Sequence, residues 1–349
     1  MNVTTARRPV ISAWSAVSPF GLRAADFVEG VRNGTPTFAP LGEKWQTPAE
    51  QACLVPDFDI REVLGKKGTR SMDRVTALAV TAVDRLVRYG NGDRIGGVGE
   101  HAALVLGTNT GSAQSIMDFT RDSLVGEHPY FVDPARFPNT VMNCAAGQCA
   151  IWHDLRGPNT TIAAGRLTGL LALRYALRLQ RAGHADTVLF GAAEEFSTAR
   201  SWLDWHVRGD AAGPLGEGCA LLLLEPEEQA ERHGRTALAE VLGLSVGVHH
   251  GDATPVLARC VRRVLEGLNE SAVDAALIGA ESDREALPDG VADVADVVAV
   301  GDLIGDTGAA SGAFQLVAAL GRFGGAGRHV LLTSADHDGA VGAALLQLS

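Results

Sequence analysis

The segment GPNTTIAAGRLTGLLALRYALRLQRAG, residues 157–183, has the pattern of a strand, a tight turn and a helix. Many α/β enzymes present a nucleophile at such a turn, and here the residue at its apex is Arg166. A guanidinium group stays protonated and cannot act as an acyl acceptor. Arg166 therefore predicts binding or structural work at a position where catalysis would need a thiol or a hydroxyl.

The five cysteines are scattered and form no CxxC pair, which indicates small buried hydrophobic residues more than a zinc or disulfide framework. They are Cys53, Cys144, Cys149, Cys219 and Cys260. Cys144 and Cys149 could also be a redox or nucleophilic pair, although no basic neighbour in the sequence lowers a thiol pKa there.

Three other groups have a chemical and a structural interpretation. His249, His250 and Asp252 could bind a metal, but adjacent side chains in an extended chain point to opposite faces, so we predict a solvated loop and no metal. Glu194 and Glu195 could be paired acid/base carboxylates, and we favour structural hydrogen bonding. Two further aromatic residues have helical spacing and are expected to pack, with an interface role as the alternative: Trp202 and Trp205.

Strands and helices alternate along the chain, which favours an α/β fold. Leucines at helical spacing from Leu170 predict a helix that Gly183 ends, between a strand at 160–163 and another within 185–195. This βαβ succession predicts parallel pairing beneath the helix. Further strands are expected at 10–17, 102–106, 219–226 and 328–335, with helices over 24–34 and over 72–90, the latter capped by Ser71 and ended by Gly90.

Composition limits the class of protein. The chain of 349 residues is 46% hydrophobic and can bury a large core. Its formal charge of −11, without a Lys/Arg-rich block, predicts that it binds neither nucleic acid nor anionic membranes. Without an apolar leader or a long apolar run, we expect a cytoplasmic protein.

Taken together, these segments resemble a β-ketoacyl synthase of the thiolase fold. The stretches that carry the resemblance are RRPVISAWSAVSPFG, RSMDRVTALA, FPNTVMNCAAGQCAIWHDLRGPNTTIA, GEGCALLLLEP and GDLIGDTGAASGAFQLVAAL. The resemblance covers most of residues 7–225 and implies an α/β, thiolase-like fold with two similar βαβ-rich halves in a layered αβαβα core. We expect an N-terminal ketosynthase-like half at 1–225 and a shortened C-terminal half at 226–349.

In this family a cysteine accepts the acyl chain, and two histidines promote decarboxylation and stabilise the oxyanion. The resemblance places the cysteine on Arg166, the first histidine on Ala280 within 279–281, and the second on Asp306. The family's lysine falls at or near Asp302. The resemblance thus implies no catalytic residue and no cofactor in this chain.

Such a chain is similar to the chain length factor of type II polyketide synthases, the inactive partner of an active β-ketoacyl synthase in a heterodimer that shapes the polyketide tunnel. Chain length factors commonly carry glutamine at the apex, so Arg166 departs from the pattern. Trimmed segments between 243 and 274 and between 320 and 334 resemble the compact partners of polyene or other highly reducing systems. The acyl carrier protein is expected to act through the complex, docking on the partner.

The family geometry places the apex beside the second histidine position. We therefore predict that Arg166 pairs with Asp306, with Glu281 as a second candidate, because an unpaired buried arginine would cost roughly 3 to 5 kcal/mol. The alternative is that Arg166 binds an acyl or carrier-linked anion.

The resemblance also implies that the strand before the apex, 160–165, pairs with its counterpart across a dimer axis. Candidates for setting tunnel depth or for ordinary interface packing lie between 112 and 148 and on that strand. They are Ile116, Met117, Phe119, Thr140, Met142, Asn143, Thr160, Thr161 and Ile162. A different class of function stays open: a stand-alone thiolase-fold acyltransferase, decarboxylase or hydrolase that uses unmatched residues such as Cys144 or His153.

Overall fold

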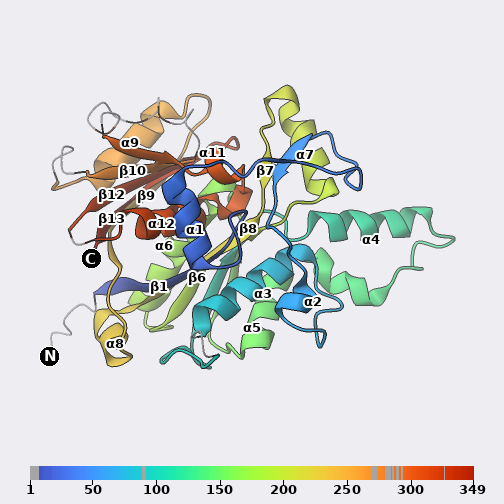
Figure 1. Ribbon diagram of the computed structural model, residues 1–349, viewed down its shortest axis with the longest axis horizontal. Helices are drawn as coiled ribbons and strands as arrows, with labels where there is room; N and C mark the ends of the chain where they lie inside the picture. Colours follow the sequence, from blue (N-terminus) through green and yellow to red (C-terminus); the bar gives the residue numbers. More distant parts are fainter. Residues whose placement is uncertain are drawn as a thin grey trace.

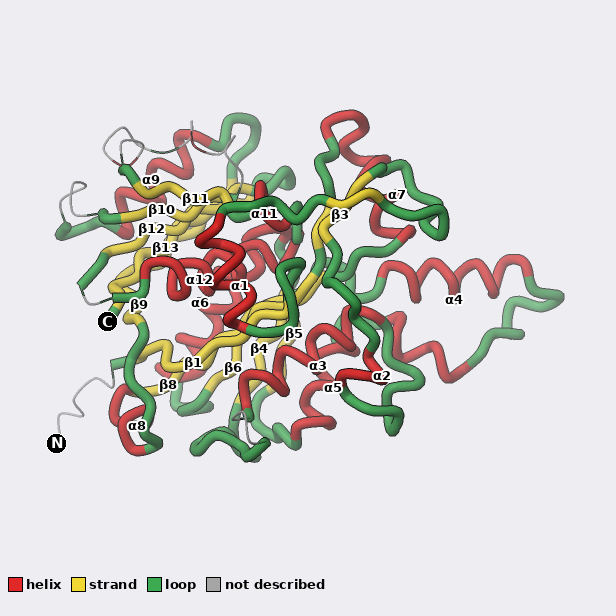
Figure 2. Tube along the Cα trace, in the orientation of Figure 1, coloured by secondary structure: helices red, strands yellow, loops and turns green. Residues whose placement is uncertain are grey.

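A large mixed sheet forms the framework of the molecule (Figures 1 and 2). The structure is a computed structural model that describes residues 8–88, 92–268, 273–279, 284, 287, 291, 294–325 and 327–349. From the centre of the sheet to one edge, the strands are β1 (Pro9–Val17), β8 (Gly218–Pro226), β6 (Val188–Glu194), β4 (Ala103–Gly107) and β5 (Asn159–Ile162). Toward the other edge they are β9 (Ala239–Val248), β13 (Ala340–Leu348), β12 (His329–Ala335), β10 (Ala275–Ile278) and β11 (Asp296–Ala299).

The two halves of the sheet repeat one topology. In each half, a first strand pairs antiparallel with the last, the last pairs antiparallel with the fourth, and the remaining pairs are parallel. The halves meet where β1 pairs with β9 through only two residue pairs, Val10 with Glu240 and Ile11 with Ala239. The two similar halves predicted from the sequence are thus confirmed, while the boundary at 225/226 stays a prediction.

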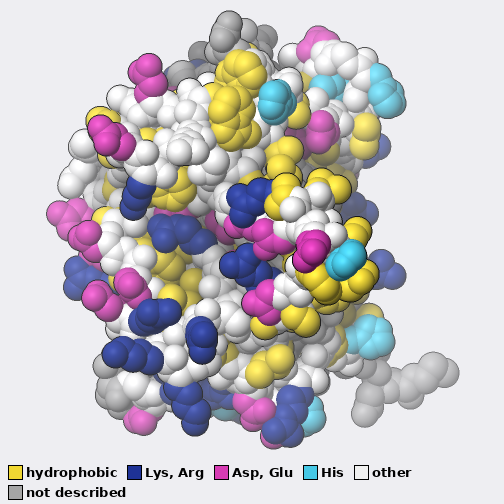
Figure 3. Space-filling model, turned by 90° about the vertical axis from the view of Figure 1, so that its right-hand side faces the viewer, with side chains coloured by type: hydrophobic (Ala, Val, Ile, Leu, Met, Phe, Trp, Pro, Cys, Tyr) yellow, Lys and Arg dark blue, Asp and Glu magenta, His cyan; other side chains and the backbone are white. Residues whose placement is uncertain are grey.

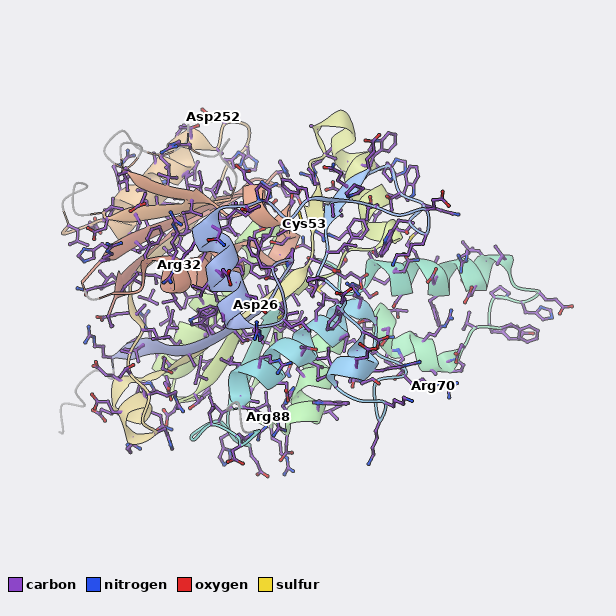
Figure 4. All side chains as sticks on the ribbon, viewed as in Figure 1. Asp26, Arg32, Cys53, Arg70, Arg88 and Asp252 are labelled. Atoms are coloured by element: carbon purple, nitrogen blue, oxygen red, sulfur yellow. The ribbon has the colours of Figure 1, made fainter. Side chains whose placement is uncertain are left out.

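Helices form three layers, and the central layer packs against strands of both halves of the sheet. The outer layer of the first half contains α3 (Arg74–Val87) and α5 (Cys144–His153), and the outer layer of the second contains α9 (Thr254–Val264). The central layer contains α6 (Thr168–Arg181) and α12 (Ser311–Phe323), with α1 (Ala24–Asn33) beside α12. Asp26, labelled in Figure 4, lies in the first turn of α1. Together these layers make the αβαβα arrangement.

Strand residues alternate between the layers, as a sheet buried on both faces requires. On β6, Val188 and Phe190 face the central helices, whereas Leu189 and Ala193 face α3 and α5. The same alternation on β12 divides the second half between α12 and α9. The leucine stripe of α6 is buried, with Leu170 and Leu173 fully covered.

The central helices approach each other closely at Gly169. A β-carbon there would lie 2.2 Å from the backbone nitrogen of Ala313 on α12. Only glycine fits this contact, which brings the beginnings of α6 and α12 together. Each beginning is preceded by a short 3₁₀ turn, η2 (Gly165–Leu167) before α6 and η6 (Gly308–Ala310) before α12.

An arm projects from the body of the molecule (Figure 1). We define the arm as residues 113–140, comprising α4 (Ala113–Val125), a loop, and the 3₁₀ segment η1 (Pro134–Thr140). Large apolar side chains on it are exposed, among them Leu124, Val125, Tyr130, Phe131 and Phe137. Figure 3 faces this side of the molecule and shows hydrophobic side chains gathered among charged ones.

The remaining elements surround these layers. They are α2 (Ile60–Val63), α7 (Thr198–Arg208), α8 (Glu227–Arg232), α11 (Gly301–Ile304), η3 (Gly209–Ala211) and a small sheet of β2 (Ala39–Pro40), β3 (Gln51–Cys53) and β7 (Leu215–Gly216). No helix within the described ranges has both the length and the apolar character needed to cross a membrane.

Three local expectations need correction. The cap of α3 is Asp73 and not Ser71, because the Asp73 carboxylate accepts a hydrogen bond from the backbone N–H of Thr76. That helix ends at Val87, and Gly90 lies outside the described residues. The strand expected at 160–163 spans 159–162, and β5 and β6 do not pair directly, because β4 lies between them as the parallel partner of both.

Candidate functional site

A polar pocket of about 480 Å³ opens where α6 and α12 begin. Its charged lining comes from both halves of the chain, and α7 contributes part of the share of the first half. The lining includes Arg166, Arg200, Arg208, Asp306, Asp336 and His337. The pocket thus contains the two positions at which the resemblance places a cysteine and the second histidine.

Arg166 and Asp306 form an ion pair in this pocket. The Arg166 Nη2 donates a hydrogen bond to Asp306 Oδ2 over 2.7 Å, and their side chains are only 16% and 14% exposed. The predicted pairing is therefore confirmed. The second candidate partner, Glu281, and the degenerate position Ala280 lie outside the described residues.

Two more arginines surround Asp306. Arg208 Nη1 lies 3.3 Å from Asp306 Oδ2, and Arg200 Nη2 donates to the backbone carbonyl of Asp306 over 2.9 Å. The other carboxylate oxygen of Asp306 accepts from the backbone N–H of Gly308. Burial alone would raise the pKa of Asp306, but the charge and hydrogen bond of Arg166, with the charge of Arg200, outweigh it and hold that pKa well below its usual range.

A second carboxylate covers the turn that carries Arg166. Gly165 has a φ of +55°, and a β-carbon on it would lie 1.4 Å from Asp336 Oδ2. Burial raises the pKa of Asp336, and the nearby charge of Arg166 opposes that rise. A cation at the beginning of α6 is unfavourable to the helix dipole, so these carboxylates supply the compensating charge.

Glu194 and Glu195 hold neighbouring segments by hydrogen bonds, as predicted. Glu194 Oε2 accepts from the backbone N–H groups of Asn109 and Ala309, at 3.2 and 3.3 Å. Glu195 Oε1 accepts from the hydroxyl of Ser112 and, at 3.3 Å, from the backbone N–H of Gln114. Burial raises the pKa of Glu194, and burial followed by the charge of Asp73 raises that of Glu195 to about 7.

Cys144 and His153, the two residues considered for a different catalytic chemistry, lie in surroundings that do not favour catalysis. Cys144 is partly buried, and burial and the charge of Asp73 raise the pKa of its thiol. His153, the last residue of α5, is buried against α3, where its Nε2 is 3.0 Å from the carbonyl oxygen of Val80. The other cysteines are buried as expected, and burial raises the pKa of Cys53, labelled in Figure 4, to about 11. A thiolate is therefore disfavoured at both cysteines.

The buried, neutral imidazole of His153 predicts that the free energy of unfolding falls at acid pH. Burial lowers its pKa from 6.5 to about 4, so the unfolded chain binds more protons than the folded chain between these values. Stability contributed by the neutral imidazole is present above pH 6.5 and is lost as the pH falls through 4, by roughly 3 kcal/mol at about 1.4 kcal/mol per pH unit. Glu195, whose pKa is raised, acts oppositely and loses stability as the pH rises toward 7. The informative quantity is therefore the difference between wild type and a variant.

We expect His153→Gln to flatten the fall in unfolding free energy between pH 7 and pH 4, measured by urea denaturation. His250, which is exposed, provides the control: His250→Gln should keep the wild-type dependence. If both variants retain the same pH dependence as wild type, His153 does not carry the acid sensitivity.

The candidates for tunnel depth lie on the arm and on the segment that follows it. Ile116, Met117 and Phe119 are on α4, and Phe119 packs against Phe137 of η1 with ring centroids 6.0 Å apart. Thr140 ends η1, where its hydroxyl donates to the carbonyl of Phe137. Met142 and Asn143 follow and are exposed, as is Met117. The structure thus brings these residues to one region, while their role stays a prediction.

The candidates on β5 lie at an edge of the sheet. Thr160, Thr161 and Ile162 pair with β4 on one side, and β5 is the last of the described strands in the order. All three are half-buried, and the Thr161 hydroxyl is buried without a hydrogen-bond partner among the described residues. An edge strand with one unpaired side is a template for pairing with another chain.

The remaining candidates are the histidines after β9 and the two tryptophans of α7. His249 follows β9 and is only half exposed, with both ring nitrogens buried, so the expected solvated loop applies to His250 alone. Trp202 and Trp205 pack edge to face on α7, but each is 40% exposed. The indole N–H of Trp202 donates to the carbonyl of Gln46.

Sequence reasoning missed several members of the pocket, namely Arg200, Arg208, Asp204 and Asp336. The spacing of Asp204 and Arg208 by four residues on α7 was a usable signal, because such pairs meet on a helix face, here at 2.6 Å. Nothing local indicated that α7 would approach Asp306.

The duplicated strand order, with two central helices whose beginnings share a polar pocket, defines a thiolase-like fold. Residues 7–230 match the model of the β-ketoacyl synthase N-terminal domain. The chain belongs to the β-ketoacyl synthase family.

Two curated relatives of the same name match this chain over different lengths. The curated 3-oxoacyl-[acyl-carrier-protein] synthase 2 of Coxiella burnetii is 26% identical over 276 residues, and that alignment covers 71% of this chain and 64% of the relative. The protein of the same name from Rhizobium meliloti is 26% identical over 364 residues, covering 92% and 83%. The chain thus spans less than two thirds of the length of the first of these relatives.

Solved structures match over nearly the whole chain. A chain of the ishigamide ketosynthase/chain length factor is 41% identical with a TM-score of 0.90, covering 98% of this chain and 99% of that one. A type II PKS acyl-carrier protein in complex with its ketosynthase bound to the hexaketide (AntDE:AntF) contains a chain at 16% identity with a TM-score of 0.79, which shows the shared fold alone.

Proposed function

We propose that this chain is a non-catalytic subunit of a type II polyketide synthase, a chain length factor that pairs with an active β-ketoacyl synthase and shapes the tunnel in which the polyketide grows. The observation that carries the proposal is the Arg166–Asp306 ion pair. It occupies the positions that the family resemblance assigns to the acyl-accepting cysteine and one catalytic histidine. A protonated guanidinium cannot accept an acyl group, and an ionised carboxylate cannot donate the hydrogen bond that stabilises an oxyanion.

Two surface features support association with another chain. The edge strand β5 leaves one side unpaired among the described strands, and the arm exposes large apolar side chains. Exposed apolar groups of this kind mark protein interfaces. The acyl carrier protein would reach the complex through the partner, because a chain of charge −11 is a poor docking surface for an acidic protein.

The proposal extends to a polyene or otherwise highly reducing system. Its support is the compact length shared with the ishigamide ketosynthase/chain length factor, where each chain covers almost all of the other. The residues proposed to set tunnel depth, with bulky side chains blocking elongation, are Ile116, Met117, Phe119 and Thr140 on the arm and Met142 and Asn143 on the segment after it.

Co-expression with an active β-ketoacyl synthase, taken from a neighbouring gene where one is encoded there, tests this function. We expect a stable complex, elongation only when both chains are present, and acyl adducts detected by intact-protein mass spectrometry on the ketosynthase alone. A thioester or ester adduct on this chain during turnover, or elongation by this chain without a partner, would contradict the proposal.

A further inference from the structure

The outer face of α6 carries an arginine stripe beside the edge strand. We use this name for Arg174, Arg178 and Arg181, which follow one another at helical spacing and are all exposed. With Ile162 of β5, Leu171 and Tyr175, they line a depression of about 580 Å³. No carboxylate lines it, and none of the three arginines pairs with an acidic residue among those described.

The composition of this face is that of an interface. Tyr175, Leu171 and Ile162 are half-buried and form an apolar strip, and the arginines lie along it. Arginine and tyrosine are enriched where proteins bind one another, whereas a solvated helix face would mix both charges. On a chain of net charge −11, a row of three arginines without an acidic partner among the described residues therefore indicates a protein-binding face.

Symmetry then restricts the partner. A two-fold dimer uses the same patch on both subunits, so two identical chains joined at β5 would bring both arginine stripes into one interface. Like charges facing each other across an interface oppose association, and complementary charges promote it. The stripe therefore disfavours a second copy of this chain.

Resting on the proposed function, we infer that the arginine stripe of α6 determines partner choice, and that its occupant is a non-identical chain of the same fold with acidic side chains on the helix that faces α6. The charges act as a specificity device that favours the heterodimer and opposes the homodimer.

The test reverses the charge of the arginine stripe and compares this variant with an equal charge reversal on another helix. The variant is Arg174→Glu/Arg178→Glu/Arg181→Glu, and the control is Arg259→Glu/Arg262→Glu/Arg263→Glu on α9, whose arginines are also exposed. We expect the first variant to weaken binding of the ketosynthase by roughly tenfold or more at low salt, with little change for the control. Equal binding by the two variants would overturn the inference.

A second experiment does not depend on the ketosynthase. Wild type mixed with the stripe variant at low salt should form mixed dimers above the statistical share of about half by native mass spectrometry. The same mixture with the α9 control should show no such excess. If wild type binds no ketosynthase, the proposed function fails, and the mixed-dimer measurement still decides the role of the stripe. Absence of a mixed-dimer excess counts against it. Thermal unfolding of each variant verifies that the exposed changes preserve the fold.

Discussion

Replacement of Arg166 by alanine is expected to lower the free energy of unfolding by about 3 kcal/mol. The change leaves the Asp306 carboxylate buried without the guanidinium that lies 2.7 Å away. The loss falls at the lower end of the range for broken buried pairs because Arg208 still lies 3.3 Å from the same oxygen. Urea denaturation followed by tryptophan fluorescence measures the effect.

Two further variants separate the pair from the loss of a side chain. Removing both charges in Arg166→Met/Asp306→Leu should recover most of the lost stability, because the two partners of the buried pair are removed together and Arg208 keeps its ion pair with Asp204. Arg178→Ala, on the exposed face of the same helix, should change stability by less than about 0.5 kcal/mol. Equal stabilities of Arg166→Ala and wild type would show that the pair does not stabilise the fold.

Gly169→Val is expected to destabilise the chain by about 3 kcal/mol or more, or to prevent its folding. The added β-carbon would lie 2.2 Å from the Ala313 nitrogen and 2.6 Å from the Gly312 carbonyl carbon, both backbone atoms that cannot rotate away. The central helices would have to separate, which disturbs the core between the two halves of the sheet. Soluble yield and the midpoint of urea denaturation report the result.

A glycine elsewhere in a helix provides the control. Gly147 lies within α5, and a β-carbon on it would meet nothing within 4 Å. Gly147→Ala should therefore stabilise the chain by roughly 0.5 to 1 kcal/mol through helix propensity. If Gly169→Val were as stable as wild type, the close contact between α6 and α12 would not be essential.

The sequence could predict local elements because their signals are local. Leucine spacing and Gly183 located α6, whose chain turns away at a glycine with φ of +69°. The cap of α3 was misplaced because serine and aspartate both serve as caps, and the sequence alone does not show which of Ser71 and Asp73 lies one residue before the first helical turn.

The site could be predicted only as far as the family resemblance reached. Arg166 and Asp306 are 140 residues apart, and no periodicity joins them, but aligning both positions with the family did. Arg208 and Asp336 enter the pocket from α7 and from the segment after β12, elements whose approach depends on tertiary packing. Their participation therefore had no local signal.

The ion pair between the two central helices also restricts how this chain can evolve. A cysteine placed at 166 would face the carboxylate of Asp306, whose negative charge opposes formation of a thiolate. Replacing Asp306 first would leave a guanidinium without its nearest acceptor. Each single substitution toward a reactive thiol at position 166 would therefore give an intermediate that is less stable or less reactive than the final variant.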